Sequence, residues 1–235
     1  MTRRIFTLTP RLAACAGLVR VGSRLADIGT DHAKLPVWLA KQGLIQSAVA
    51  CDISPGAIAN ADKTVAAHDA GNVVKTRISN GLTGINPDEI DDIVIAGMGG
   101  ELIAKILPAV NWIKNDRYNL IFQPMSRPER LRLILLGGHF NIIREIAVRE
   151  GGRIYLVIQA RYSNPENPDN PLFFTHPCTG LLPYNGDRAS RDYLMRQVKL
   201  FQAELIGCRL RGDSDRIRRL EEYIPALEKA LNEMD

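Results

Sequence analysis

The segment Leu25–Pro36, LADIGTDHAKLP, places two acids, a glycine and a histidine directly after an apolar run. Carboxylates and an imidazole in this arrangement could bind a metal or hold a polar ligand, and a glycine there lets the backbone pass close to a ligand. Three interpretations are open at this point: a nucleotide pocket, a metal site or an ordinary turn. We expect no metal site, because no second His or Cys stands at ligand spacing from His32.

The glycine spacing after this apolar run separates two classes of nucleotide ligand. A dinucleotide site usually carries G-x-G-x-x-G, so that a pyrophosphate rests on the N-terminus of the next helix. Here Asp31 and Lys34 replace the second and third glycines after Gly29. A carboxylate there would repel a pyrophosphate, but not S-adenosylmethionine, which has no phosphates and carries an amino group and a sulfonium. The substitution therefore favours this methyl donor over NAD.

Polar and small residues also follow the next apolar runs. Asp52 lies 23 residues after Gly29, where an acid can hydrogen-bond ribose hydroxyls, although it could instead cap the next helix. Asn80 could contact an adenine amino group or form an ordinary Asn-Gly turn. The segment 97–99, with Met98 at its centre, could leave space for the donor methyl and an incoming base, or could serve close packing of a helix on a strand.

Short apolar runs alternate with helical patterns over the first 162 residues. Strands are predicted at 24–29, 47–53, 73–79, 91–97, 119–123, 140–150 and 153–162, and helices at 9–20, 33–43, 55–69, 100–115 and 127–137. This alternation predicts a parallel sheet with helices on both faces. Only Gly151–Gly152 separates the last two strands, which predicts a hairpin and one antiparallel strand at the sheet end. Such a plan is typical of the Rossmann-like, seven-stranded α/β fold of class I methyltransferases.

The last third of the chain has a different pattern. Residues 163–186 are rich in Pro, Asn and Gly and predict a linker. Apolar residues then recur at heptad spacing on both sides of RGDS (211–214), which predicts two helices folded back as an antiparallel coiled-coil hairpin. Asp213 or Ser214 should cap the second helix, and Pro225 should kink or interrupt it.

Composition and charge narrow the possible partners. The chain has 235 residues, of which 46% are hydrophobic, and no apolar run reaches the roughly 18 residues of a membrane-spanning helix. Its four cysteines lie far apart and predict neither a zinc ribbon nor a disulfide framework. We therefore expect a cytoplasmic protein with no membrane or metal partner, and we expect a monomer.

Arginines concentrate in two places. The first 24 residues hold five arginines and no acid, and further arginines gather at the predicted hairpin tip near 209–219. A basic edge of this kind suits a polyanion such as nucleic acid, although a solvated helix face would explain it equally well.

Three motifs together resemble a known family. They are ADIGTDHAKLP (26–36), DDIVI followed by the AGMGG of 96–100, and the Gln-Pro of 123–124. This combination resembles the bacterial tRNA adenine-N1 methyltransferase family that modifies adenosine 22, over nearly the whole chain. The resemblance implies a methyltransferase domain over 1–162 that uses S-adenosylmethionine, a linker and coiled-coil domain over 163–235, and tRNA as the substrate. The chain departs from the pattern of the family that it resembles at Lys34, Asn80 and Met125.

The motifs and the resemblance assign the following residues. Asp31 and Asp27 are the expected catalytic residues. Donor-binding residues are expected to be Asp27, Gly29, Asp31, His32, Asp52, Ile53, Asn80, Gly81, Leu82, Gly97, Met98 and Gly99. Residues expected to contact tRNA are Arg3, Arg4, Arg11, Gln123, Pro124, Arg127, Arg211 and Arg218.

Methylation at adenine N1 needs alignment more than a strong base, because N1 carries an in-plane lone pair. N1 lies on the Watson–Crick edge, so the base must be unpaired or flipped out. The product base is cationic, and we expect Asp31 to stabilise that charge or orient the adenine amino group, while Asp27 holds the donor's amino end; the two roles could be exchanged. The rival hypotheses are an NAD-dependent oxidoreductase, a non-catalytic RNA-binding protein with this fold, and a methyltransferase of another substrate.

Overall fold

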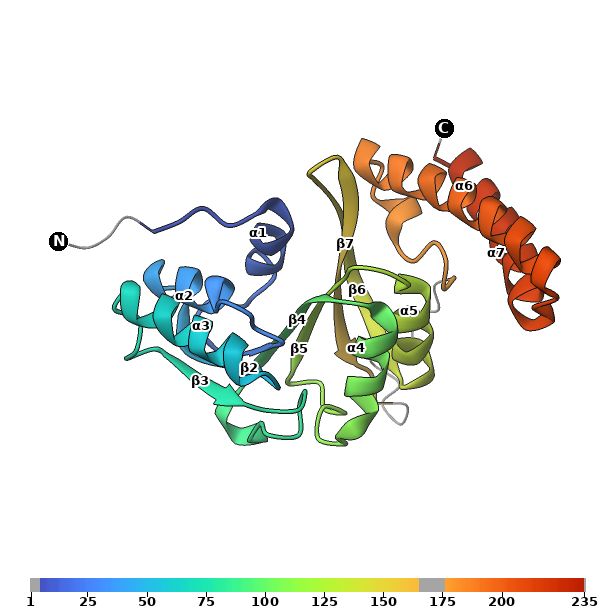
Figure 1. Cartoon of the computed structure of the whole chain (residues 1–235). Coiled ribbons are helices and arrows are strands. Elements are labelled where there is room, and N and C mark those ends of the chain that lie inside the picture. Colours follow the sequence, from blue (N-terminus) through green and yellow to red (C-terminus); the bar gives the residue numbers. More distant parts are fainter. Residues whose placement is uncertain (1–4, 165–175, 235) are drawn as a thin grey trace.

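A seven-stranded sheet forms the centre of the molecule (Figure 1). The computed structural model describes residues 5–164 and 176–234. The strands are β1 (Ser23–Ile28), β2 (Ile45–Asp52), β3 (Val74–Ile78), β4 (Asp92–Met98), β5 (Asn119–Pro124), β6 (Phe140–Glu150) and β7 (Arg153–Tyr162). Their order in the sheet is β3-β2-β1-β4-β5-β7-β6, which is the predicted class I methyltransferase plan.

The sheet is parallel from β3 to β5, and β7 is antiparallel to both of its neighbours. The chain turns at Gly151 and Gly152, which both have positive φ, and β7 then returns between β6 and β5. The predicted hairpin and its one antiparallel strand are therefore at the sheet end, and the antiparallel strand is second from the edge. The reason is that the hairpin folds back toward the centre of the sheet, where β5 still offers an unpaired edge.

Helices cover both faces of the sheet (Figure 1). They are α1 (Pro10–Ala16), α2 (Lys34–Lys41), α3 (Pro55–Ala67), α4 (Gly100–Ile106), α5 (Pro128–Gly137), α6 (Arg188–Arg211) and α7 (Ser214–Asn232), with short 3-10 turns at η1 (Pro87–Glu89), η2 (Leu107–Ala109) and η3 (Leu182–Tyr184). One apolar core lies under α1, α2 and α3, and the other joins α4 and α5 with α6 and α7.

Two of the helices end several residues before the predicted position. The predicted helix 9–20 ends at Ala16, because the chain turns there and the Arg20 N–H bonds the Asp92 carboxylate at 2.8 Å instead of a helical carbonyl. The predicted helix 100–115 ends at Ile106, two residues before Pro108, whose nitrogen cannot donate to a helical carbonyl.

The C-terminal helices pack against each other as the heptad pattern predicts. The seam residues Leu194, Phe201, Leu220 and Leu227 are all buried. Asp213 caps α7, since its Oδ1 accepts a hydrogen bond from the Arg216 N–H at 3.1 Å. The helix continues through Pro225, so the predicted interruption is wrong.

A buried ion pair ties the sheet to the segment that precedes α6. Arg132 on α5 and Glu145 on β6 lie 2.8 Å apart, and both side chains are fully buried. Arg132 also donates to the Pro177 and Cys178 carbonyls, and Glu145 accepts from the Leu181 N–H at 2.6 Å. The part of the predicted linker that the structure describes is thus attached to the sheet, while residues 165–175 lie outside the described residues. The domain division at residue 162 stays a prediction.

Candidate active site

A pocket of about 350 Å³ lies at the carboxyl ends of β1 and β4. We call it the switch-point pocket, because β1 pairs with both β2 and β4 and the strand order reverses there. In open α/β sheets ligands bind at this place. The pocket is lined by Thr9, Arg11, Leu12, Asp27, Gly29, Thr30, Asp31, His32, Ala33, Lys34, Leu35, Ala96 and Gly97. It therefore contains the central motif of the sequence.

Asp27 forms the inner part of the switch-point pocket. Its side chain lies near the end of β1 and only 7% of the residue is exposed. The pKa of Asp27 is raised to about 6, chiefly by burial; a hydrogen bond with Thr30 opposes the shift, and the nearby Asp52 carboxylate adds to it. A buried carboxylate with a raised pKa is suited to a cationic ligand, which would favour its ionised form.

Asp31 and His32 lie at the mouth of the same pocket. Their side chains are 68% and 47% exposed, and Asp31 Oδ2 is 3.1 Å from His32 Nε2. The loop is closed below them by a hydrogen bond from the Ala33 N–H to Thr30 Oγ1 at 3.0 Å. Ala33 itself has a positive φ of 48°, which turns the chain into α2. Asp31 is thus the accessible acid and Asp27 the buried one.

Gly29 has a left-handed backbone conformation that strains any other residue, and the end of the Met98 side chain lies against it. It has a φ of 79°, and a Cβ built on it would be 1.9 Å from Cε of Met98. Its N–H and that of Thr30 donate to the Cys51 carbonyl at 2.7 and 2.8 Å, which joins the end of β1 to β2. The glycine after β1 therefore lies against Met98 at the end of β4.

The predicted residues after β2 and β3 lie outside the switch-point pocket. Asp52 Oδ1 accepts a hydrogen bond from the Ser54 N–H at 2.7 Å. The N-cap of α3 is Ser54 and not Asp52, as the alternative interpretation had it, although Asp52 bonds that N-cap residue. Ile53 and Asn80 are exposed. Leu82 is fully buried in the core, so its side chain offers no surface to a ligand. The donor-binding roles assigned here, and those of Gly81 and Gly99, stay predictions.

Arg11 and the buried Gln123 are joined by hydrogen bonds beside the pocket. Arg11 Nη1 donates to Gln123 Oε1 at 2.8 Å, and the Gly97 N–H donates to the same oxygen at 3.2 Å. The Gln123 amide nitrogen donates to the Pro124 carbonyl. Gln123 is fully buried, and both its amide oxygen and its amide nitrogen form hydrogen bonds within the protein. The predicted direct contact of Gln123 and Pro124 with tRNA stays a prediction.

Arg11 is held in place by the hairpin of β6 and β7. Its backbone N–H and its Nε both donate to the Glu150 carboxylate, at 3.0 and 3.1 Å. Its guanidinium lies over the Tyr155 ring, 5.9 Å from the centroid. Arg11 is therefore a fixed part of the pocket wall and not a free surface cation. Arg3 and Arg4 lie outside the described residues.

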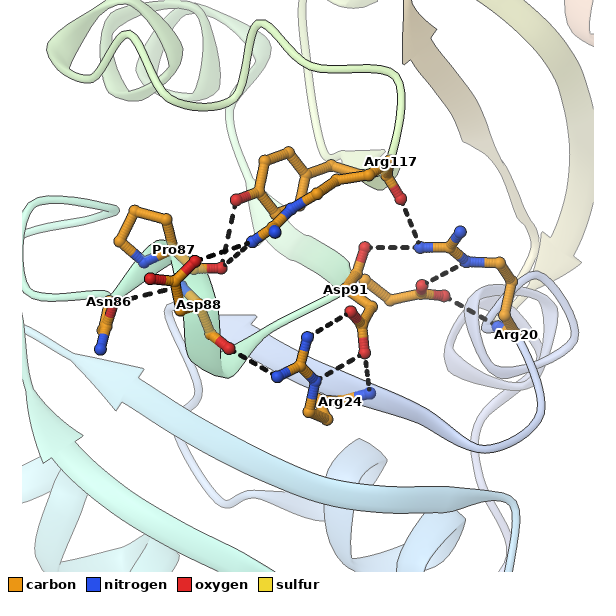
Figure 2. A network of polar contacts seen from close by, with 9 residues as sticks. Arg20, Arg24, Asn86, Pro87, Asp88, Asp91 and Arg117 are labelled. Atoms are coloured by element: carbon orange, nitrogen blue, oxygen red, sulfur yellow. Dashed lines mark hydrogen bonds and ion pairs between the residues drawn. The ribbon is translucent and has the colours of Figure 1, made fainter.

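The other arginines of the predicted basic edge are neutralised within the protein (Figure 2). Arg20 binds the fully buried Asp92 carboxylate at 2.7 Å, and Arg24 binds Asp91 at 2.6 Å. The hydrogen bonds from Arg24 lower the pKa of Asp91 to about 2. Arg117, from the loop before β5, bonds the Pro87 carbonyl nearby. The prediction that these arginines are free to bind a polyanion is wrong for Arg20 and Arg24, because each forms an ion pair with an acid of this chain, Asp92 and Asp91 respectively.

The predicted basic tip is only partly free. Arg216 is buried and binds Glu204 on α6, and Glu204 also binds Arg127 at 3.0 Å. Arg211 and Arg218 are exposed, although Arg218 Nη2 lies 3.3 Å from Asp215. Contacts of these residues with tRNA stay predictions.

Sequence reasoning missed several residues that line the switch-point pocket. Thr30 stands inside the recognised motif, and its hydroxyl could have been identified as the group that closes the loop. Thr9 and Leu12 carry no local signal, because they reach the pocket only through the packing of the N-terminal segment and α1 at the sheet end.

No helix in residues 5–164 and 176–234 is both long and apolar enough to cross a membrane. Within the same ranges, no three or more His, Cys, Asp or Glu side chains come together in an arrangement that could hold a metal ion.

Comparison with known proteins identifies the family. A family model described as a methyltransferase domain matches residues 8–158. The tRNA (adenine(22)-N(1))-methyltransferase of Bacillus subtilis is 34% identical over 153 residues, which are 65% of this chain and 64% of that enzyme. In this alignment the chain spans less than two thirds of its curated relative.

Solved structures match over more of the chain. The Streptococcus pneumoniae Sp1610 structure, a putative tRNA (m1A22) methyltransferase in complex with S-adenosyl-L-methionine, is 27% identical, covers 96% of this chain and all of that one, and has a TM-score of 0.80. The Bacillus subtilis TrmK structure is 24% identical with a TM-score of 0.82, covers 96% of this chain and 99% of that one, and supports the fold. These matches confirm the predicted fold class and the predicted resemblance. The chain belongs to the methyltransferase domain family.

Proposed function

We propose that this protein transfers a methyl group from S-adenosylmethionine to N1 of adenosine 22 in tRNA. The observation that carries the proposal is the match to the Streptococcus pneumoniae structure, which contains S-adenosyl-L-methionine and covers both the sheet and the C-terminal helices. The curated Bacillus subtilis relative has the same named activity. A cytoplasmic, monomeric protein with a methyltransferase domain over 1–162 fits this role.

The switch-point pocket suits this donor. Asp27 would bind its amino group, because a buried carboxylate gains most from a cationic partner. Gly29 would let the donor approach the backbone, and Asp31 stands where a phosphate-binding loop would have glycine. S-Adenosylmethionine supplies the methyl group and a sulfonium leaving group. The residues of this chain then have to bind it, orient it and align the adenine.

Alignment is the principal task of the pocket residues. Gly97 lines the pocket beside Ala96, and its N–H is fixed by Gln123. This exposed backbone leaves room for a flat base next to the donor methyl. Asp31, at the mouth, would face the adenine edge and stabilise the positive charge that develops on the ring. Its exposure makes it the better candidate for this role, and the burial of Asp27 makes that residue the better candidate for the donor.

The deciding experiment is incubation of the full chain with isotopically labelled S-adenosylmethionine and tRNA, followed by nucleoside analysis. We expect label in 1-methyladenosine, and none when adenosine 22 is replaced by guanosine. Label in another nucleoside, or in a protein, would refute the substrate. A protein that fails to bind the donor in calorimetry would refute the activity altogether.

A variant series tests the role of Asp31. We expect Asp31→Ala to reduce kcat about 10- to 100-fold with little change in donor affinity, because the carboxylate acts on the developing charge. Asp116→Ala is the matched control, because Asp116 is exposed on a loop outside both the pocket and the described ion pairs. Normal turnover in Asp31→Ala would exclude this role.

A further inference from the structure

A second pocket, of about 520 Å³, lies between the sheet and α6. We call it the α6 pocket. Its walls come from residues 124–129, between the end of β5 and the start of α5, from residues 153–156 at the start of β7, and from one face of α6. Figure 1 shows α6 lying beside the hairpin of β6 and β7. Its volume lies within the usual range of small-ligand pockets, about 300–1,000 Å³.

The apolar part of the α6 pocket is aromatic and partly exposed. Tyr155 and Phe201 line it together with Leu200 and Met125, and the last two are 50% and 40% exposed. Large apolar side chains left open beside a tyrosine ring form a surface on which a flat base can stack.

Some charged residues of the α6 pocket form ion pairs and others do not. Arg127 binds Glu204, and Glu129 lies 3.7 Å from Arg127, so this side of the pocket is internally compensated. Arg153 and Arg196 are exposed, and each lacks an ion-pair partner among the residues that the structure describes. One comes from β7 and the other from α6, so the pocket has a free cation on each of two walls. Such an arrangement suits a phosphate.

Arg11 connects the two pockets. It lines the switch-point pocket, while its guanidinium lies over the ring of Tyr155, which lines the α6 pocket. Arg11 Nη1 is also 3.9 Å from the sulfur of Met125. Arg11 therefore lies between the two pockets, because it lines one of them and contacts two residues that line the other.

We propose that the α6 pocket binds a nucleotide next to the methylated adenosine, with its base on Tyr155 and Leu200 and its phosphate between Arg153 and Arg196. This inference rests on the function proposed above. The methylated base itself belongs to the switch-point pocket, because methyl transfer requires its N1 within contact of the donor. Arg11 and Gln123 separate the α6 pocket from that position.

The first test compares two double variants of the full chain. Arg153→Ala/Arg196→Ala removes the two free cations, and Lys63→Ala/Arg188→Ala removes two exposed cations on α3 and at the start of α6, outside the pocket. We expect the first pair to raise the Kd for tRNA about tenfold and to reduce the salt slope of binding by roughly 1 to 2. The control pair should leave both near the wild-type values, and the Kd for S-adenosylmethionine should be the same in all three proteins.

The second test locates the nucleotide. tRNA with a fluorescent purine at either neighbour of adenosine 22, or at position 22 itself, is titrated with wild-type protein and with the Arg153→Ala/Arg196→Ala variant. We expect a change in emission at a neighbouring position that the variant loses. Loss of the signal only at position 22, or equal tRNA affinity in the two double variants, would overturn the proposal. If the wild-type protein binds the donor but methylates no tRNA, the proposed function fails and not this site alone.

Discussion

Arg11 Nη1 and the fully buried Oε1 of Gln123 are joined by a hydrogen bond of 2.8 Å, although 112 residues separate them in the chain. The same oxygen accepts from the Gly97 N–H at the end of β4. Through this pair, α1 determines the position of the backbone that borders the switch-point pocket. Glu150 holds Arg11 in this position, because its carboxylate accepts hydrogen bonds from the backbone N–H and from the Nε of Arg11.

Removal of this pair should impair the site more than the fold. We expect Arg11→Ala to lower kcat/KM about 5- to 100-fold, because a buried oxygen that loses one of its two donors costs about 1–3 kcal/mol and frees the Gly97 segment. Steady-state kinetics with tRNA, together with donor titration, would measure the effect. Arg11→Lys should be as impaired as Arg11→Ala, because a lysine ammonium cannot donate to Glu150 and to Gln123 at the same time as the planar guanidinium does. Full activity in Arg11→Lys would show that only the charge matters.

The raised pKa of Asp27 predicts a pH dependence of donor binding. The ionised carboxylate attracts the donor's amino group, and its pKa of about 6 means that it becomes protonated as the pH falls through 6. Affinity for S-adenosylmethionine should therefore fall by up to about tenfold per pH unit below 6. Calorimetric titration between pH 5 and 8 would show this, and Asp27→Asn should bind more weakly with a flat profile. An unchanged inflection in Asp27→Asn would assign the titration to another group.

The raised pKa of Asp27 can also be tested without the donor, through the pH dependence of the free energy of unfolding. Because the folded protein raises the pKa of Asp27 from 3.8, protonation stabilises the fold below pH 3.8, and this stabilisation is lost as the pH rises through about 6. Asp27→Asn should therefore raise the free energy of unfolding at pH 8, by about 1–3 kcal/mol, and change it little at pH 4. Urea unfolding at the two pH values would measure the difference.

The buried pair of Arg132 and Glu145 should be essential to the junction between the sheet and the C-terminal helices. Glu145→Ala would leave the Arg132 guanidinium without its carboxylate in a site with no exposure, and we expect a loss of about 3–5 kcal/mol in urea unfolding. The double replacement Arg132→Met/Glu145→Leu removes both charges and should recover a large part of this loss. If the single and double variants were equally unstable, packing and not the unpaired charge would be responsible.

Arg20 should behave as a structural residue and not as a tRNA contact. Arg20→Ala leaves the Asp92 carboxylate, which has no exposure, with only the Asn119 amide and a backbone N–H, and we expect a loss of about 1–3 kcal/mol in stability. The salt dependence of tRNA binding should stay unchanged, unlike that of the Arg153→Ala/Arg196→Ala variant. A reduced slope for Arg20→Ala, measured with a protein shown to be folded, would return this residue to the binding surface.

The strands could be predicted because their signals are local. The bounds predicted for β6 and β7 are those of the structure, and Gly151–Gly152 already marked the turn between them. The Asp27–His32 motif could be placed at a ligand pocket for a similar reason. Parallel strands end at the same edge of a sheet, so polar residues that follow them come together whatever their side chains contact.

The sequence by itself therefore determined the class of fold and the place of the pocket, since both follow from short-range patterns and from the rules of parallel sheets. Only the tertiary structure decided which arginines are free. Arg11, Arg20 and Arg24 find their acids between 67 and 139 residues further along the chain, and Arg153 and Arg196 line the same α6 pocket from different elements. A charge on the chain becomes a binding site or an internal ion pair according to what packs against it, and that depends on the path of the whole chain.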